Sequence, residues 1–274
     1  MSKAIDKRVA VLGLGKMGGI LLEALLREKI LSPENVVGSD CDSERARRLG
    51  ERLEISVTTD NAKAVEQADL VLICVKPNVV KGLVEEIRPH ISSDQLLISI
   101  AASVPTHYIE AALDAEIPVV RAMPNTPCVV GYGMTGISKG RFADESHLEI
   151  TRTLFEAVGI TITLDEKHMD AVTGLSASGP AFVYVILESL GEAGVKVGLP
   201  RDAANLLAAQ TVRGAAQVVL ETGDHPALLK DAVTTPGGCT VDGLLELEEG
   251  KLRLTLIKAV VKATHRAKEL LLVN

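Results

Sequence analysis

The motif GLGKMG at residues 13–18 constrains the fold of this chain more than any other feature. It follows the short apolar run of residues 8–12 and opens a segment with helical spacing that continues to residue 30. A glycine-rich turn between a strand and a helix is typical of dinucleotide binding: Gly13 permits the tight turn, Gly15 lets a pyrophosphate approach the backbone, and Gly18 allows close helix–strand packing. The context therefore predicts a dinucleotide site, with a purely structural glycine turn as the alternative.

Strand-like and helix-like segments alternate through the first half of the chain. The predicted strands cover residues 35–40, 55–59, 69–75, 95–102, 118–124, 136–140 and 160–164, and the predicted helices cover residues 43–53, 61–68, 78–91 and 144–159. This alternation predicts an α/β fold with a Rossmann-type doubly wound sheet. After about Asp165 the pattern is helical, as in residues 201–221 and 252–272. We therefore predict a dinucleotide-binding domain over residues 1–165 and an all-α domain over residues 166–274.

The composition narrows the class of protein. Hydrophobic residues make up 47% of the chain but aromatic residues only 2%, so the core is aliphatic, and we expect some apolar surface to be buried between subunits. The net charge of −7 argues against a nucleic-acid-binding or anionic-membrane-binding surface. The apolar run of residues 175–187 is too short to cross a bilayer and contains Pro180, and the N-terminus lacks the apolar region of a signal peptide.

The four cysteines are widely spaced and match no metal-ligand pattern. They are Cys41, Cys74, Cys128 and Cys239. We expect neither a metal site nor a disulfide framework, and a cytoplasmic protein with reduced thiols.

The end of the second predicted strand leaves the type of nicotinamide cofactor open. Asp40 stands where an acid usually accepts the ribose hydroxyls of NAD. Ser39 and the nearby Arg45, Arg47 and Arg48 suit the 2′-phosphate of NADP instead. A third reading is that Asp40 caps a turn and that the arginines form a solvated helix face.

Other strand ends and turns carry weaker candidates. Lys76 and Asn125 are polar groups beside prolines, and each is as consistent with a structural turn as with a site. Ser176 has no histidine or acid in a nucleophile-elbow context, so packing through small residues explains it better than hydrolase chemistry. His168 is more consistent with the surface of a helix start than with a catalytic base.

The segment TTPGGCT at residues 234–240 interrupts an otherwise helical region. We interpret Thr235 as an N-cap and Pro236 as the first helical residue. The following backbone N–H groups would lack intrahelical partners, and two glycines would let an anion approach them. The segment thus predicts a cradle for a carboxylate or phosphate, with an ordinary inter-helix turn as the alternative.

Taken together, these motifs resemble the pyrroline-5-carboxylate reductase family. The matching segments are GLGKMG at 13–18, DN at 60–61, VKP at 75–77, RAMPNTP at 121–127, SASGPAFVY at 176–184, GVKVGLPR at 194–201, HPALLKD at 225–231 and TTPGGCTVDGL at 234–244. They run in order across almost the whole chain, and the last is the family's signature. Ala177 and Phe182 depart from the family's usual Gly and Tyr, and Asp40 is unusual for an enzyme that prefers NADPH.

The resemblance implies a cytoplasmic oxidoreductase that reduces the cyclic imine 1-pyrroline-5-carboxylate to L-proline, the final step of proline biosynthesis. Hydride would pass from NADPH, with NADH as the alternative, to the C=N carbon. The helical domain would form a homodimer, with a decamer of five dimers as the further assembly.

The resemblance also implies the site residues. Those for the cofactor are Gly13, Leu14, Gly15, Lys16, Met17 and Gly18 at the pyrophosphate, Ser39 and Asn61 near the adenosine ribose, and Val75, Lys76, Pro77, Ala101 and Ala102 on the nicotinamide side. Thr235 and the backbone amides of Gly238, Cys239 and Thr240 would bind the substrate carboxylate. The Thr240 hydroxyl would face the imine nitrogen as the catalytic group, with water as the ultimate proton source.

Two other functions remain open on the sequence. A β-hydroxyacid dehydrogenase should carry a catalytic lysine one helical turn after Ser178, where Phe182 and Val183 stand. A non-catalytic dinucleotide sensor would need only the N-terminal motif.

Overall fold

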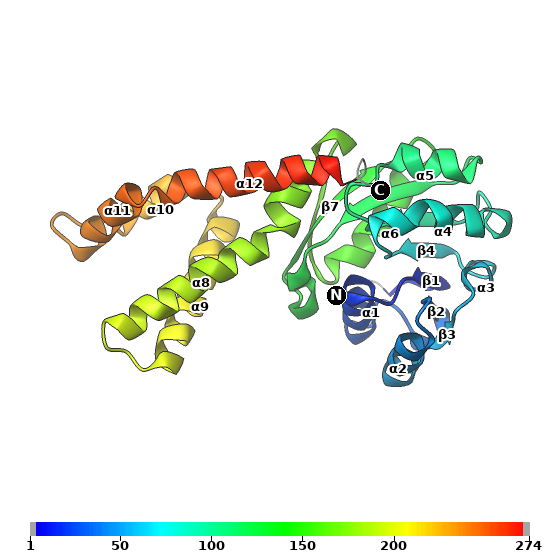
Figure 1. Ribbon diagram of the computed structural model, residues 1–274, viewed down its shortest axis with the longest axis horizontal. Helices are drawn as coiled ribbons and strands as arrows, with labels where there is room; N and C mark the ends of the chain where they lie inside the picture. Colours follow the sequence, from blue (N-terminus) through cyan, green and yellow to red (C-terminus); the bar gives the residue numbers. More distant parts are fainter. Residues whose placement is uncertain (1–3, 271–274) are drawn as a thin grey trace. The chain divides into compact units, whose positions relative to one another are not determined.

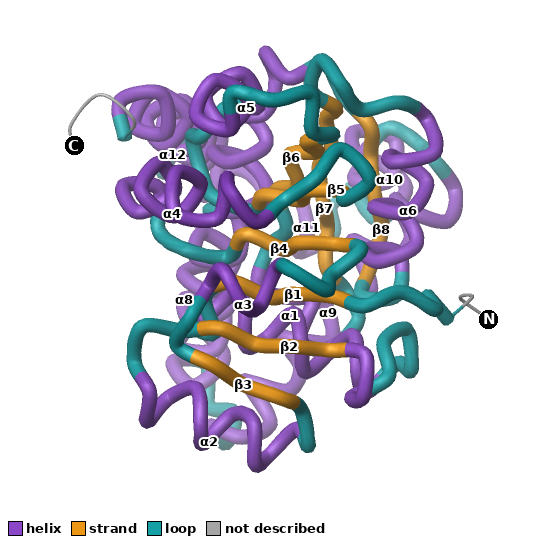
Figure 2. The backbone as a smooth tube through the Cα atoms, turned by 90° about the vertical axis from the view of Figure 1, so that its right-hand side faces the viewer, coloured by secondary structure: helices purple, strands orange, loops and turns teal. Residues whose placement is uncertain are grey.

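The computed structural model describes residues 4–270 and contains an eight-stranded sheet. The strands are β1 (Val9–Leu12), β2 (Val36–Ser39), β3 (Ser56–Thr58), β4 (Leu70–Ile73), β5 (Leu96–Ser99), β6 (Val119–Met123), β7 (Gly133–Lys139) and β8 (Gly159–Thr163). Their spatial order is β3-β2-β1-β4-β5-β6-β7-β8, and every neighbouring pair is parallel except β6–β7. In Figure 2, β3, β2, β1 and β4 follow one another upward from the lower part of the view.

Helices cover both faces of this sheet. They are α1 (Lys16–Arg27), α2 (Ser43–Leu53), α3 (Asn61–Val65), α4 (Val80–Ile87), α5 (Thr106–Leu113), α6 (Glu145–Glu156) and α7 (Met169–Val172). Because side chains alternate across a strand, Val9 and Val11 of β1 enter one core cluster with α1, α2 and α6. Ala10 and Leu12 enter a second cluster with α3, α4 and α5. The predicted doubly wound α/β fold is confirmed.

The remaining helices are α8 (Gly179–Lys196), α9 (Arg201–Thr222), α10 (Pro226–Ala232), α11 (Cys239–Glu249) and α12 (Leu252–Glu269). Contacts divide the chain into two compact units: one holds residues up to Ser178 together with the chain from Val261, and the other holds Gly179–Val260. The domain boundary near Asp165 stays a prediction. The predicted helix over residues 252–272 ends in two residues, Leu271 and Leu272, that lie outside the described part of the chain.

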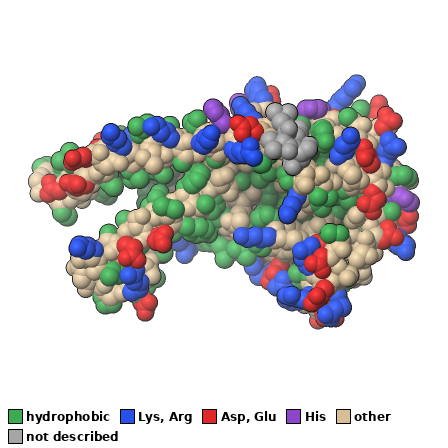
Figure 3. Space-filling model, viewed as in Figure 1, with side chains coloured by type: hydrophobic (Ala, Val, Ile, Leu, Met, Phe, Trp, Pro, Cys, Tyr) green, Lys and Arg blue, Asp and Glu red, His purple; other side chains and the backbone are tan. Residues whose placement is uncertain are grey.

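The helical unit exposes much apolar surface. Within it α8 and α9 pack on each other (Figure 1). A Cβ on Gly194 would lie only 2.7 Å from the Cβ of Ala204. Large apolar side chains more than half exposed are Tyr184, Val185, Val197, Leu206, Leu207, Leu220, Leu228, Val233, Leu245 and Ile257. Hydrophobic side chains are visible over these helices in Figure 3. A patch this extensive marks an interaction surface.

One helical segment, Glu166–Lys196, is long and apolar enough to cross a membrane by length and composition. The prediction concerned only the apolar run of residues 175–187, which is too short to cross a bilayer; the helical segment that contains this run is longer. The segment is longer because the 3₁₀ turn Glu166–His168, α7, the π-helical turn Thr173–Ala177 and α8 follow one another, with only the bend at Ser178 between the last two. Pro180 follows the bend at Ser178, and at the second position of α8 it removes no hydrogen bond within that helix.

Candidate active site

The glycine-rich turn joins β1 to α1 and leaves the start of α1 open. Gly13 has φ 99° and donates its N–H to the Ser39 carbonyl at 2.8 Å. A Cβ on Gly18 would lie 2.0 Å from the Gly13 oxygen, so this close helix–strand contact requires glycine. Gly15 precedes the helix without a side-chain cap, and a Cβ there would meet nothing within 4 Å. The first amides of α1 therefore face accessible space, which fits a pyrophosphate.

The other predicted cofactor residues lie at the same edge of the sheet, because β2, β1, β4 and β5 are adjacent and parallel. Ser39 ends β2, and its hydroxyl donates to the Asn61 side chain at 2.8 Å. Val75 and Lys76 follow β4, and Val75 lies directly beside Gly13. Pro77 begins a short 3₁₀ turn, and Ala101 and Ala102 follow β5. The structure thus brings together the residues expected around one dinucleotide.

Asp40 is fully engaged by protein donors. One carboxylate oxygen accepts from the Leu14 N–H at 2.8 Å and the Arg45 Nε at 3.0 Å. The other accepts from the Asp42 N–H at 2.9 Å and the Arg45 Nη2 at 2.6 Å. Burial opposes ionisation of this carboxyl, but the hydrogen bonds from Arg45, Asp42 and Leu14 outweigh it and keep the pKa of Asp40 below its usual value.

Four donors use the four acceptor positions of a carboxylate, so Asp40 in this arrangement has none left for ribose hydroxyls. Of the three interpretations, its geometry matches the one in which it caps a turn. It also fastens the glycine-rich turn to α2 through Leu14 and Arg45.

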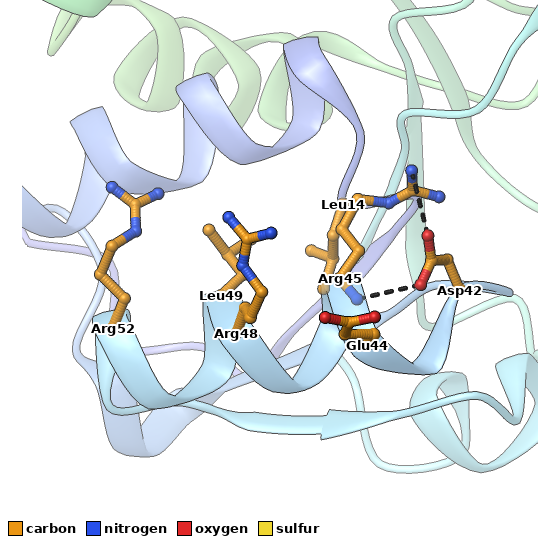
Figure 4. A pocket seen from close by; sticks show the side chains of 7 residues that line it. All are labelled: Leu14, Asp42, Glu44, Arg45, Arg48, Leu49 and Arg52. Atoms are coloured by element: carbon orange, nitrogen blue, oxygen red, sulfur yellow. Dashed lines mark hydrogen bonds and ion pairs between the residues drawn. The ribbon is translucent and has the colours of Figure 1, made fainter.

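Beside Asp40 lies a cavity of about 440 Å³, which we call the arginine pocket. Its lining residues are Leu14, Asp42, Glu44, Arg45, Arg48, Leu49 and Arg52 (Figure 4). Arg45 is paired with Asp40, and Arg52 with Glu23 at 2.8 Å. Within residues 4–270, Arg48 has no ion-pair partner. The pocket therefore presents, next to Asp40, a guanidinium without an ion pair among the described residues, together with the carboxylate of Glu44.

The signature segment forms a turn before α11 and not the start of that helix. The Gly238 N–H donates to the Thr235 carbonyl at 3.0 Å, and Gly237 has φ 68°. Proline at the first central position and a positive-φ glycine at the second are typical of a type II turn. The helix begins at Cys239, with Gly238 as its N-cap, so the prediction of a helix start at Pro236 is wrong.

This turn changes which amides are free. The Gly238 amide, predicted to bind the substrate carboxylate, is already bonded to Thr235. The amides of Cys239 and Thr240 occupy the first two positions of α11 and lack intrahelical acceptors. A Cβ on Gly238 would lie 2.4 Å from the Thr235 hydroxyl, so glycine is needed for that hydroxyl to stay where it is. The segment combines two free amides with the hydroxyls of Thr235 and Thr240.

Asn125 connects two segments of the chain through its side chain. Its side-chain oxygen accepts from the Met134 N–H at 2.9 Å, and its amide nitrogen donates to the Ser176 carbonyl at 3.2 Å. It therefore ties the start of β7 to the π-helical turn. Sequence reasoning missed Arg121, a buried arginine in the middle of β6; the available signal was a lone charge within the apolar run VVRAM.

Comparisons with known proteins agree with both halves of the chain. Residues 166–270 match the family described as pyrroline-5-carboxylate reductase dimerisation, and residues 8–103 match NADP oxidoreductase coenzyme F420-dependent. The pyrroline-5-carboxylate reductase of Methanosarcina acetivorans is 41% identical over 265 residues, covering 97% of this chain and 98% of the relative.

Two solved structures have the same fold over the whole chain. The Plasmodium falciparum pyrroline carboxylate reductase with NADP bound has a TM-score of 0.89 at 29% identity and covers 98% of this chain and 100% of its own. A pyrroline-5-carboxylate reductase from Coxiella burnetii has a TM-score of 0.88 at 34% identity and covers 97% and 98%.

Proposed function

Because the chain belongs to the pyrroline-5-carboxylate reductase family, we infer that it reduces 1-pyrroline-5-carboxylate to L-proline with NAD(P)H, the final step of proline biosynthesis. The observation that carries this inference is the 41% identity to a curated reductase over nearly the full length of both chains. A dehydrogenase of β-hydroxyacids and a dinucleotide sensor have no such support.

The cofactor residues act mainly through the backbone. The open start of α1 supplies N–H groups and the positive end of a helix dipole for the pyrophosphate. Ser39 and Asn61 are proposed to contact the adenosine ribose, and Val75, Lys76, Pro77, Ala101 and Ala102 the nicotinamide side. When bound, the reduced nicotinamide supplies the hydride for the C=N carbon.

We propose that this chain prefers NADPH to NADH. Asp40 has no acceptor position left for ribose hydroxyls, and Arg48 offers an unpaired guanidinium in the arginine pocket. A 2′-phosphate is the part of NADPH that would use such a group.

The substrate end is proposed to lie at the signature turn. The free amides of Cys239 and Thr240 and the Thr235 hydroxyl would hold the pyrroline carboxylate. Gly238 contributes by lacking a side chain, since its amide is used in the turn. The Thr240 hydroxyl would hydrogen-bond the ring nitrogen and orient the C=N bond. Positioning of two reactants is the main source of rate in this scheme, since a threonine hydroxyl is a poor acid.

The deciding experiment measures consumption of NADPH and NADH with 1-pyrroline-5-carboxylate and with a panel of keto acids. We expect turnover with the imine alone; turnover only with keto acids, or with nothing, contradicts the assignment. Thr240→Val should lose most of kcat while binding NADPH normally. Thr234→Val is the matched control, because its hydroxyl is already bonded to the Lys230 carbonyl at 2.7 Å.

The protein is a homo-oligomer, and we propose a dimer built by the helical domain over residues 166–274, with the dinucleotide-binding domain over residues 1–165. The extensive exposed apolar surface of α8 to α12 supports this interface. A decamer of five dimers and a cytoplasmic location are further proposals; light scattering of the purified protein separates a dimer from a decamer by mass.

A further inference from the structure

A second cavity, of about 380 Å³, lies wholly within the unit that contains the sheet, and its wall includes Ser103, the residue that follows Ala102. Its lining residues are Ser103, Pro105, His107, Arg121, Glu166, Lys167, Asp170 and Lys268. We call it the Arg121 cavity. A water molecule takes up roughly 30 Å³ in the liquid, so the space admits a much larger guest.

Arg121 is a buried guanidinium with poor hydrogen bonding. The residue is 3% exposed, and its Nε has no partner among the described residues. Its other contacts are long: 3.4 Å from Nη2 to Asp170 and 3.7 Å from Nη1 to Glu166. Burying a charged donor without acceptors is costly, and a guanidinium has five N–H groups to satisfy. This group therefore needs a further acceptor.

Ser103 presents a second unsatisfied group. It is 6% exposed, its hydroxyl has no hydrogen-bond partner within residues 4–270, and its φ is 66°. A left-handed conformation is unfavourable for a residue other than glycine, and retained strain of this kind clusters at functional sites. Ser103 and Arg121 both line the cavity.

The charges in the cavity have both signs. Glu166 is committed to α5, since it accepts from the Thr106 N–H at 2.7 Å and the Thr106 hydroxyl at 2.8 Å. Among residues 4–270, the Asp170 carboxylate has only its long contact to Arg121. Lys167 is paired with Asp165 at 3.2 Å, whereas Lys268 has no ion pair among the described residues. Arg121 and Lys268 are thus balanced by two carboxylates, and a guest should carry no net charge.

We propose that the Arg121 cavity binds a small zwitterionic amino acid, with its carboxylate at Arg121, Ser103 and Lys268 and its ammonium group at Asp170. Such a ligand supplies the acceptor that Arg121 and Ser103 lack and the donor that Asp170 can use. The proposal does not depend on reductase activity or on the site at residues 235–240.

The test is calorimetric titration of the full-chain protein, without cofactor or imine, using L-alanine, acetate and methylammonium as probes. L-Alanine should bind saturably, and acetate and methylammonium should each bind at least tenfold more weakly. No saturable response to L-alanine, or acetate binding as tightly as L-alanine, overturns the proposal.

Variants locate the site. Ser103→Ala and Lys268→Met should weaken L-alanine binding about tenfold, while Lys262→Met, on the same helix but outside the cavity, should not. Asp170→Asn keeps an oxygen acceptor for Arg121 but removes the negative charge proposed to bind the ammonium group. It should therefore abolish the preference for L-alanine over acetate, measured as the ratio of their dissociation constants. If Asp170 had only a structural role, this ratio would not change. Thr235→Val should leave L-alanine binding unchanged. Equal binding by Lys268→Met and Lys262→Met, or loss of binding in Thr235→Val, overturns the assignment to this cavity.

Discussion

Replacing Arg48 by Gln should weaken NADPH binding and leave NADH binding unchanged. Arg48 lines the arginine pocket, and in the part of the chain that the structure describes it has no ion pair to break. Glutamine keeps most of the side-chain length and helix propensity. The variant therefore removes one positive charge where the 2′-phosphate is proposed to bind.

The size of the effect follows from the exposure of Arg48. A hydrogen bond to a charged group contributes about 1.5–3 kcal/mol in a protected site. Arg48 is exposed to solvent, and screening reduces such an interaction to about 1 kcal/mol. The Kd for NADPH should therefore rise about fivefold, while the Kd for NADH should stay within about twofold. The NADPH effect should shrink as salt is raised, because an exposed charge pair is screened.

Nicotinamide fluorescence on titration with each reduced cofactor gives both dissociation constants without turnover. Arg47→Gln is the matched control: Arg47 is next in the helix but pairs with Glu51 at 2.7 Å and does not line the pocket. An equal loss of NADPH affinity in Arg47→Gln and Arg48→Gln, or an equal loss of NADPH and NADH affinity in Arg48→Gln, would refute the assignment of the 2′-phosphate to Arg48.

Three further predictions test other parts of the site. The pKa of Asp40 is lowered in the fold, so its carboxylate stabilises the protein above the usual aspartate pKa of 3.8, and this stability is lost as pH falls through the lower folded value. The difference in unfolding free energy between wild type and Asp40→Asn, measured in urea, should be full at pH 7 and narrow below pH 3.8. A difference independent of pH would contradict the role of the charge. Gly238→Ala should displace the Thr235 hydroxyl, because the new Cβ would lie 2.4 Å from it, and should therefore raise the KM for the imine. Gly243→Ala is the control, because a Cβ there meets nothing within 4 Å. Equal KM values for the two variants would contradict the role of the turn. Thiol labelling at pH 8 should modify the exposed Cys41 and Cys239 quickly. Cys74 is half-buried, and desolvation of its thiol raises the pKa of Cys74 to about 12, so it should react much more slowly; rapid labelling of Cys74 in mass spectra would contradict this.

The alternation of strands and helices and the dinucleotide edge were predictable because they depend on local patterns. Buried parallel strands are continuous apolar runs, and the glycine motif identifies the first crossover. Helix α5 was missed. Its first residue is held by Glu166, which accepts from the Thr106 N–H and hydroxyl from a position 60 residues away. No pattern within the segment reveals such a long-range cap.

The site was predictable in its composition but not in its hydrogen bonding. Thr-Pro at residues 235–236 is consistent with a helix start and with a turn, and the positive φ of Gly237 decides for the turn. Asp40 is likewise consistent with a ribose acceptor and with a turn cap. Which of the two applies depends on Arg45, in the first turn of α2, and on the Leu14 amide from another strand end.

The apolar segment Glu166–Lys196 is better explained by a protein interface than by a bilayer. Its charge-free part runs from Ala171 to Leu187, close to the shortest span that crosses a membrane. Two residues of that part are packed in the protein: Thr173 is buried, and a Cβ on Gly174 would lie 2.1 Å from the Thr264 hydroxyl of α12. Most of the exposed apolar side chains of the segment lie in α8, with Leu175 before it, and α8 ends in Glu188, Glu192 and Lys196. The charge-free portion of α8 is too short to span a membrane alone, but with the exposed apolar side chains of α9 and α11 it provides the surface that a homo-oligomer needs.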